Sequence, residues 1–294
     1  MNYNSSGYAE ECIRSVYEHS KGLSFEIILV DNNSESFSRS QFDQFPNIVI
    51  IENEENLGFA KANNVGIASA KGSTILLLNV DTKLLANTLY ESWSFLKDKG
   101  DEIGFVGARL INDDGTHQQS HFPFPNQRTE FLRAFRIQKL WHKLFAKKGV
   151  RSITGQFEQT DWISGAYIHF DKKLLDEFPD TRLHETFFMY IEDIQWAYYV
   201  KKDLGKKVIY LNSSEVIHYG GKTLPMNLFE KRLRFYFPHM KVFLSKNRGE
   251  AYARLFFVFL LIRHLSLYFK KSTRKPYKQL IRLTWNSKLK DQYT

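Results

Sequence analysis

The chain has 294 residues and a net charge of +9, and 43% of its residues are hydrophobic, which is enough for a globular core. Residues 250–294 hold ten Lys and Arg against two acids, so the rest is nearly neutral, which argues against a basic nucleic-acid-binding body. The single cysteine, Cys12, excludes an internal disulfide, and with the absence of a signal-peptide pattern it predicts a cytoplasmic chain.

Helical and strand patterns alternate over the first 100 residues. Each predicted strand is apolar along its length, as is typical of strands covered on both faces. The alternation predicts an α/β fold, with a mostly parallel sheet and helices on both of its faces. The predicted elements are a helix from Ser5 or Ser6 to about residue 20, strands at 26–34 (ending in the loop DNNS), 47–53 and 73–81, and helices at 58–72 and 84–100.

Two of these apolar strands end in an acidic residue. Asp31 opens the sequence DNNS after the first strand, and Asp81 lies in NVDT after the third. Ligands of open α/β sheets bind beyond the carboxyl ends of the strands, so we expect both segments to face one crevice. The plain alternative is that each acid stabilises a turn.

The second half has a different pattern. Asp114 and Gly115 predict a tight turn, and residues 126–160 are basic and weakly patterned, with one helix near 131–145. Residues 161–170 predict a strand that contains a glycine, residues 192–205 a helix with two acids at its start, and residues 206–211 a further strand.

Seven motifs then stand in order over residues 1–222: YNS, VDNNS, NLGFAKANNVG, LLLNVDT, WISGA, FFMYIEDIQW and IHYGGK. Together they resemble the inverting family 2 glycosyltransferases of the GT-A fold, in particular the bacterial rhamnosyltransferase-like branch. The resemblance implies a Rossmann-like GT-A fold with a nucleotide-sugar half (1–110), an acceptor and catalytic half (111–222) and a helical basic tail (223–294). It implies transfer of a sugar from a nucleoside-diphosphate sugar, with dTDP-rhamnose as a candidate, to a saccharide or lipid-linked acceptor in surface polysaccharide synthesis.

The resemblance also assigns a metal and a base. Asp81, in the family's Asn-x-Asp-Thr pattern, and His218 would hold Mn²⁺ or Mg²⁺, which neutralises the leaving diphosphate. Asp193 would take the proton of the acceptor hydroxyl, with Glu192 beside it. A turn aspartate, acids at a helix start and a histidine bonded to backbone are the alternatives for these residues.

Further residues line the substrate sites by resemblance. Asp31 would accept hydrogen bonds from the nucleotide base or ribose, and an Asx-turn at Asp31 and Asn33 is the alternative. For the asparagines, capping and packing are equally open, as is a core position for Trp162. The implied nucleotide-sugar residues are Tyr3, Asn4, Asp31, Asn33, Asn56, Asn63, Asn64 and Asn79, and the implied acceptor residues are Trp162 and Gly165.

One departure from the family stands at the start of the sequence. The family has an apolar strand before the motif that begins at Tyr3, but only two residues precede Tyr3 here. We expect unpaired backbone groups and an open sheet edge where that strand would lie. A second hypothesis follows, in which the chain is a catalytically impaired paralogue that binds sugar nucleotides.

The basic tail has its own alternatives. Its apolar run, residues 255–262, is far short of the ~20 residues that span a bilayer, and basic residues follow it. This composition suits a helix lying on the anionic inner face of the plasma membrane. The alternative is a helix packed on the body or on a second subunit in a homodimer. A third hypothesis, an adaptor for membrane or nucleic acid, rests on this tail alone.

Overall fold

The computed structural model describes residues 1–137, 155–220, 232–269 and 271–286, and the chain forms two compact units. Unit 1 comprises Met1–Pro123, Gly155–Phe188 and Glu192–Pro225. Unit 2 comprises Phe124–Thr154, Met189–Ile191 and Met226–Thr294. The candidate site residues named above all lie in unit 1.

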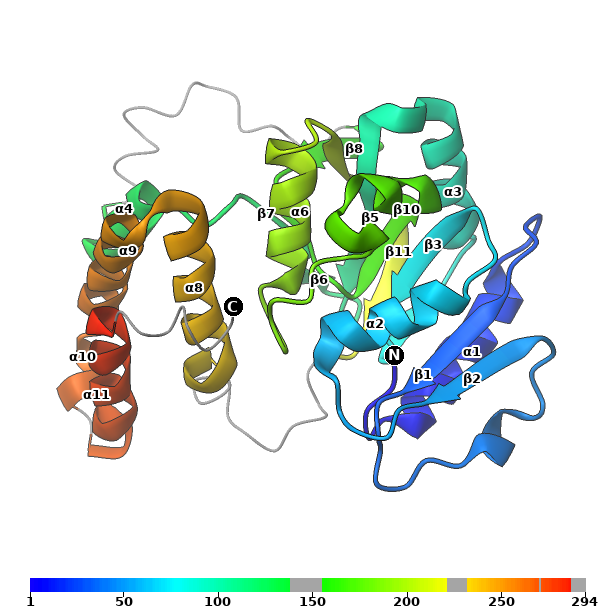
Figure 1. The fold of residues 1–294 in the computed structure, drawn as a ribbon, viewed down its shortest axis with the longest axis horizontal. Coiled ribbons are helices and arrows are strands. Elements are labelled where there is room, and N and C mark those ends of the chain that lie inside the picture. Colours follow the sequence, from blue (N-terminus) through cyan, green and yellow to red (C-terminus); the bar gives the residue numbers. More distant parts are fainter. Residues whose placement is uncertain (138–154, 221–231, 270, 287–294) are drawn as a thin grey trace. The chain divides into compact units, whose positions relative to one another are not determined.

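Unit 1 is an α/β structure, which confirms the predicted fold class (Figure 1). Strand β10 lies antiparallel between β3 and β5, while β11 runs parallel to β5 and antiparallel to β4. The parallel pair β1–β2 forms a separate ribbon. The main elements are α1 (Ser6–His19), β1 (Ile27–Asp31), β2 (Ile48–Glu52), α2 (Gly58–Ser69), β3 (Thr74–Leu78), β4 (Thr82–Leu84), α3 (Thr88–Lys99), β5 (Ile103–Ile111), β10 (Tyr167–Asp171), α6 (Glu192–Lys202) and β11 (Lys207–His218).

Shorter elements complete unit 1. Four short helices have 3₁₀ geometry apart from the positive-φ residues Asp180 and Thr181 of the last one, and four short strands pair at the margins of the sheets. They are η1 (Arg39–Phe42), η2 (Gly100–Glu102), β6 (His117–Gln118), β7 (His121–Phe122), β8 (Phe157–Thr160), β9 (Trp162–Ile163), η3 (Lys172–Glu177) and η4 (Pro179–Thr181).

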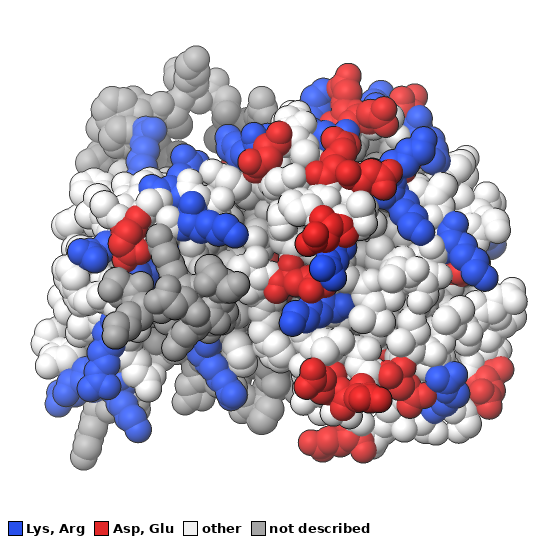
Figure 2. All heavy atoms as spheres, in the orientation of Figure 1, with Lys and Arg blue, Asp and Glu red and all other residues white. Residues whose placement is uncertain are grey.

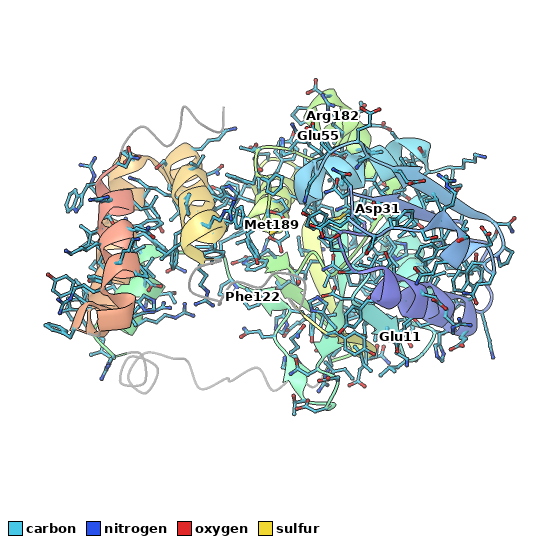
Figure 3. The ribbon with its side chains drawn as sticks, turned by 90° about the horizontal axis from the view of Figure 1, so that it is seen from below. Glu11, Asp31, Glu55, Phe122, Arg182 and Met189 are labelled. Atoms are coloured by element: carbon cyan, nitrogen blue, oxygen red, sulfur yellow. The ribbon has the colours of Figure 1, made fainter. Side chains whose placement is uncertain are left out.

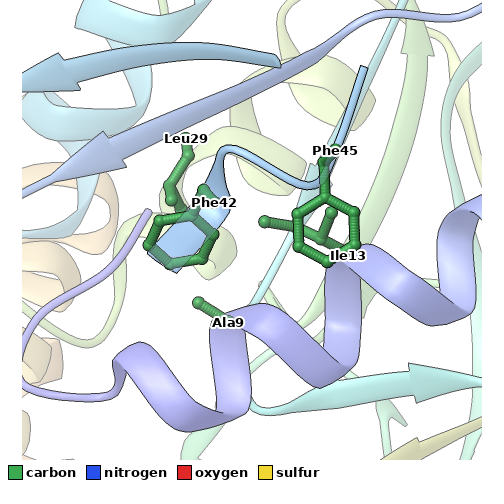
Figure 4. Close-up of a cluster of buried hydrophobic side chains, with 5 residues drawn as sticks. All are labelled: Ala9, Ile13, Leu29, Phe42 and Phe45. Carbon is green, nitrogen blue, oxygen red and sulfur yellow. The ribbon is translucent and has the colours of Figure 1, made fainter. Parts of the chain in front are cut away.

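Helices cover both faces of β1 because its side chains alternate. Leu29 packs with Ala9 and Ile13 of α1, and Phe42 and Phe45 complete this cluster (Figure 4). On the opposite face, a β-carbon added to Gly66 of α2 would lie 3.1 Å from Val30. The apolar run in β1 is therefore buried on both sides, as its composition predicts.

Two predicted elements differ from the structure. The predicted strand 161–170 is two strands, β9 and β10, because a turn closed by the hydrogen bond from Tyr167 N to Ser164 O (3.3 Å) separates them. The predicted helix near 131–145 is α4 (Gln127–Ala134), and residues 138–145 lie outside the described part of the chain. The turn at Gly115 is confirmed, with a φ of 80°.

Unit 2 is helical, which confirms the helical tail. A buried lysine of another helix caps the C-terminal end of α11. Lys241 of α8, with a side chain 2% exposed, donates to the carbonyl oxygens of Leu283, Thr284 and Asn286. No helix among the described residues combines the length and the apolar character needed to cross a membrane. The elements are α4, η5 (Arg232–Tyr236), α8 (Phe237–Arg248), α9 (Glu250–Arg263), α10 (Ser266–Phe269) and α11 (Lys271–Trp285).

Candidate active site

Asp81 and His218 lie side by side. His218 Nε2 is 3.4 Å from Asp81 Oδ1, and both side chains are mostly buried. Sheet register explains the contact: β4 starts at Thr82, whose partner in the antiparallel pair with β11 is His218. Two residues that are 137 positions apart thereby meet at one end of the sheet.

The second ring nitrogen of His218 is held by Gln118. His218 Nδ1 lies 2.6 Å from Gln118 Oε1, while Gln118 Nε2 donates to His218 O (3.2 Å) and to Asn112 Oδ1 (3.0 Å). Because the amide nitrogen is used as a donor, Oε1 is the acceptor and Nδ1 carries the ring proton. The lone pair of Nε2 in the neutral ring then points toward Asp81, as in ligating histidines oriented by a second group.

This pair fits a divalent cation. A carboxylate and an imidazole are ligands that Mn²⁺ accepts, whereas Mg²⁺ prefers oxygen. Across the described ranges of the chain, no three His, Cys, Asp or Glu side chains gather as a ready-made metal site. The chain would thus provide two ligands, Asp81 and His218, and leave other coordination positions for phosphate oxygens and water.

Asp193 lies in the first turn of α6. Its Oδ2 accepts a hydrogen bond from Gly165 N (3.1 Å), and its Oδ1 accepts one from Ile194 N (2.8 Å). Burial raises the pKa of Asp193 to about 6, although these backbone hydrogen bonds favour the charged form. A carboxyl group with this pKa is ionised at pH 7 and is still a better proton acceptor than an ordinary aspartate. Glu192, its neighbour, is buried.

The break between β9 and β10 is what brings Gly165 to Asp193. A β-carbon at Gly165 would lie 3.3 Å from the ring of Phe59, so a larger residue would push against α2. Trp162 stacks on Phe122, which Figure 3 labels, with ring centroids 4.4 Å apart, and Trp162 Nε1 donates to Pro123 O. Trp162 is half-buried, so part of its ring can still face a ligand.

Asp31 holds the start of the chain to its own loop. It is 3% exposed, and its carboxylate accepts from Asn2 Nδ2 (2.7 Å), Ser34 Oγ (2.6 Å) and Ser34 N (2.9 Å) (Figure 3). Asn4 adds a further link, because its Oδ1 accepts from Glu35 N (2.9 Å). Tyr3 is half-buried, and Asn33 lies exposed in the left-handed region (φ 63°).

The other implied asparagines have structural partners. Asn56 Oδ1 accepts from Asn32 Nδ2 (2.8 Å) and from Gly58 N (3.0 Å). Asn64 Nδ2 donates to Leu183 O and to Glu185 (both 2.8 Å). The structure therefore gives Asn56 and Asn64 packing partners.

The last two predicted asparagines, Asn63 and Asn79, lie in different parts of unit 1. Asn63 Nδ2 donates to Phe59 O (2.8 Å) within α2, and its side chain lines a cavity beside β1. Asn79 directly follows β3, where its N–H donates to Ala166 O (3.1 Å) and its carbonyl oxygen accepts from Thr82 Oγ1 (2.6 Å). Only Asn79 of these two lies beside Asp81 along the chain.

Sequence reasoning missed Gln118 and Asn32. Gln118 lies in a stretch whose only readable signal was the turn before it. Asn32 is 1% exposed, and its Oδ1 accepts from Leu57 N and Asn53 Nδ2 (both 3.0 Å), so it joins two loops. The sequence DNNS gave no indication that Asn32 would be buried.

The acids at or just beyond the ends of β1 and β3 both act on the start of the chain. The α-amino group of Met1 is buried, which lowers its pKa, and the negative charges of Asp31 and Asp81 oppose this shift. Both charges thus act on the same group, which is consistent with two strands whose carboxyl ends face one edge of the unit.

Known relatives match much of this chain. It is 30% identical over 118 residues to the Bacillus subtilis teichuronic acid biosynthesis glycosyltransferase TuaG, covering 39% of this chain and 46% of TuaG. It is 25% identical over 207 residues to the Haloferax volcanii low-salt glycan biosynthesis hexosyltransferase Agl10, covering 69% of this chain and 60% of Agl10. The chain thus spans less than two thirds of the length of either relative.

Solved structures share the fold. The mannosyltransferase PcManGT of Pyrobaculum calidifontis, solved with GDP-Man and Mn²⁺, superimposes with a TM-score of 0.60 at 15% identity, over 96% of this chain and 82% of PcManGT. S. aureus TarS with UDP-GlcNAc gives a TM-score of 0.54 at 16% identity, over 96% and 79%. The sequence profile of glycosyl transferase family 2 matches residues 1–155, more than half of the chain. The chain belongs to glycosyl transferase family 2.

Proposed function

We propose that the protein is a metal-dependent inverting glycosyltransferase. It moves a hexosyl group from a nucleoside-diphosphate sugar to a saccharide or lipid-linked acceptor in the synthesis of a surface glycan. The observation that carries this proposal is the contact of His218 Nε2 with Asp81 (3.4 Å), in the same unit as the buried carboxyl group of Asp193. Asp81 and His218 suit the binding of a divalent cation, and Asp193 suits the role of proton acceptor.

Relatives support the donor and the glycan. TuaG and Agl10 are named for teichuronic acid and for low-salt glycan synthesis. PcManGT was solved with GDP-Man and Mn²⁺, and GalNAc-T7, at a TM-score of 0.57 and 12% identity, with UDP and Mn²⁺. We propose a nucleoside-diphosphate sugar and Mn²⁺ on this basis, and dTDP-rhamnose stays one candidate donor among several.

The proposed reaction is a single displacement. The acceptor hydroxyl gives its proton to Asp193, and its oxygen forms a bond to the anomeric carbon while the bond from that carbon to the diphosphate breaks. The configuration inverts, and a nucleoside diphosphate leaves. A cation held by Asp81 and His218 would neutralise charge on that leaving group. The hydrogen bonds from Gly165 and Ile194 keep the carboxylate of Asp193 in one orientation throughout.

Unit 2 supports a proposed contact with an anionic membrane. On α11, Arg274, Lys278 and Arg282 are exposed and four residues apart, so they share one face of the helix. Exposed Phe269 precedes this helix, and exposed Trp285 is its last residue. Figure 2 shows Lys and Arg side chains across the visible face of unit 2. We propose a peripheral location on the inner face of the membrane, and a homodimer is the alternative use of this surface.

The proposal is tested with Asp193→Asn. We expect transfer to fall by about 10³-fold or more, because the proton acceptor is lost, while nucleotide binding stays within about twofold. Asp203→Asn, on the exposed turn after α6, is the matched control and should change neither. Loss of nucleotide binding together with transfer in Asp193→Asn would contradict the assignment. Binding without transfer in the unmodified chain, given the right acceptor, would favour the impaired paralogue.

A further inference from the structure

One irregular segment of unit 1, residues 183–188, precedes α6 in the chain. It forms neither a helix nor a strand, yet its residues Leu183 and Phe187 are buried. The backbone groups of a buried segment without regular structure need hydrogen-bond partners elsewhere in the protein. For this segment the partners come from α2 on one side and on the other from α6, the helix that carries Asp193.

Asn64 of α2 holds the first residue of segment 183–188. Asn64 Nδ2 donates to Leu183 O and to Glu185 Oε1 (both 2.8 Å), and Asn64 Oδ1 accepts from Leu183 N (3.3 Å). One amide group thus satisfies both backbone groups of Leu183, because an amide carries a donor and an acceptor. Asn64 is 8% exposed, so little water competes for these hydrogen bonds.

The start of α2 holds the last residue of the same segment. Phe59 N donates to Phe188 O (2.8 Å), which satisfies one of the N–H groups that the first turn of a helix leaves without a partner inside the helix. Gly58 allows this approach, because its φ is 79° and an added β-carbon would clash with Phe188 O. Helix α2 therefore binds both ends of segment 183–188.

The middle of segment 183–188 is bound to α6. Trp196 Nε1 donates to His184 O (2.8 Å), and Gln195 Nε2 donates to Thr186 Oγ1 (3.0 Å). The ring of His184 also packs edge-on against Tyr199, with centroids 4.8 Å apart. The segment thus lies between two helices, so that a movement of the segment away from α2 would also disturb α6.

Phe59 connects α2 to the surroundings of Asp193 by a second route. Its ring stacks on Trp196 of α6, with centroids 6.1 Å apart. A β-carbon added to Gly165 would lie 3.3 Å from the same ring, and Gly165 N donates to Asp193 Oδ2 (3.1 Å). Helix α2 therefore supports both the helix that carries Asp193 and the backbone that orients its carboxylate.

We propose that Asn64 is a positioning residue for Asp193. By holding segment 183–188 on α2, it fixes the start of α6, so that the carboxylate of Asp193 stays on Gly165 N. The inference rests on the proposed role of Asp193 as proton acceptor. The family resemblance implies a place for Asn64 at the nucleotide, but the structure engages its amide group with Leu183 and Glu185. Its loss should therefore slow transfer without weakening donor binding.

The test replaces Asn64 by aspartate, which cannot donate to Leu183 O and places a second carboxylate beside Glu185. We expect kcat to fall about 10–100-fold, because a small displacement of the base is costly, while KM for the donor stays within about twofold. Amide exchange at Gly165 should become about tenfold faster or more, with no change at Val106 of β5. Lys61→Ala, exposed on α2, changes the net charge by the same amount and is the matched control, which should alter none of these.

A second change tests the contact with Glu185. In Asn64→Asp combined with Glu185→Gln, the amide of the new glutamine can donate to the new aspartate, and the repulsion between two carboxylates is gone. We expect the double variant to recover about tenfold in kcat over Asn64→Asp alone, because residues in direct contact do not act additively. The slow exchange at Gly165 should return in part.

Three outcomes would overturn the positioning role. The first is unchanged exchange at Gly165 in Asn64→Asp. The second is a raised donor KM with an unchanged kcat, which would place Asn64 at the nucleotide. The third is a folded double variant that is no better than the single one. If the unmodified chain transfers no sugar, the proposed function fails by itself, and the exchange at Gly165 still decides whether Asn64 holds the surroundings of Asp193.

Discussion

The two acids that follow apolar strands occupy different surroundings. Asp31 is 3% exposed and accepts three hydrogen bonds from Asn2 and Ser34. The side chain of Asp81 is 17% exposed and faces His218 Nε2. One carboxylate therefore anchors its own loop, and the other stands beside an imidazole that can ligate a metal. An acid at a strand end marks the edge where ligands bind, but its partners decide what it does there.

The largest effect should come from the anchor. Asp31→Ala removes three hydrogen bonds and leaves the donors of Asn2 and Ser34 without their acceptor, so we expect unit 1 to lose about 2–4 kcal/mol of stability. Asp81→Ala should cost less when no metal is bound. Denaturant unfolding of both variants, with the exposed Asp43→Ala as control, measures the difference. Equal losses at positions 31 and 81 would remove the distinction between an anchor and a ligand.

Gln118 tests whether the group around Asp81 binds a metal, because Gln118 orients His218. Gln118→Leu removes the acceptor that orients His218, so we expect Mn²⁺ affinity to fall about 10–100-fold. Gln119→Leu, at an exposed neighbouring position, should leave the affinity unchanged. Calorimetric titration of Mn²⁺ with a nucleoside diphosphate present measures both. An unchanged affinity in Gln118→Leu would mean that His218 is not oriented through Nδ1.

The smallest effect is the pH dependence of the base. Burial raises the pKa of Asp193 from its ordinary value of 3.8 to about 6, so protonation removes the acceptor below pH 6. We expect kcat/KM to fall tenfold per pH unit below that value. Folding responds with the opposite sign to activity: the folded state holds this proton more tightly, so this contribution to stability is present at low pH and is lost as the pH rises through about 6. A flat rate between pH 5 and 7 would contradict the role of Asp193.

Local patterns predicted much of the fold. The strands β1 and β3 follow from apolar runs, and the acids after them mark the edge where Asp31 and Asp81 lie. The antiparallel insertion of β10 was not readable, because its partners come from positions about 60 to 95 residues earlier in the chain. The glycine inside the predicted strand 161–170 was the one local sign of a break there, but the contact of Gly165 N with Asp193, 28 residues later, was not readable.

The candidate site was readable only in part. The pairing of Asp81 with His218 came from the family resemblance, since 137 positions separate them and no spacing rule joins them. The roles of the predicted site residues stay predictions, and the structure adds Gln118, whose partner His218 lies 100 residues away. Long sequence separation, resolved by the register of β4 on β11, is the physical reason that this group could not be assembled from the sequence.

The most direct test is a thermal shift with UDP, GDP, dTDP and CMP, each with and without Mn²⁺, on the unmodified chain and on Asp81→Ala. A ligand at about 100 times its dissociation constant stabilises a protein by about 2.7 kcal/mol, which shifts Tm by several degrees. The account predicts a shift with one nucleoside diphosphate that needs Mn²⁺ and is lost in Asp81→Ala. A folded chain that shows no shift with any nucleotide, or an equal shift in Asp81→Ala, would contradict it.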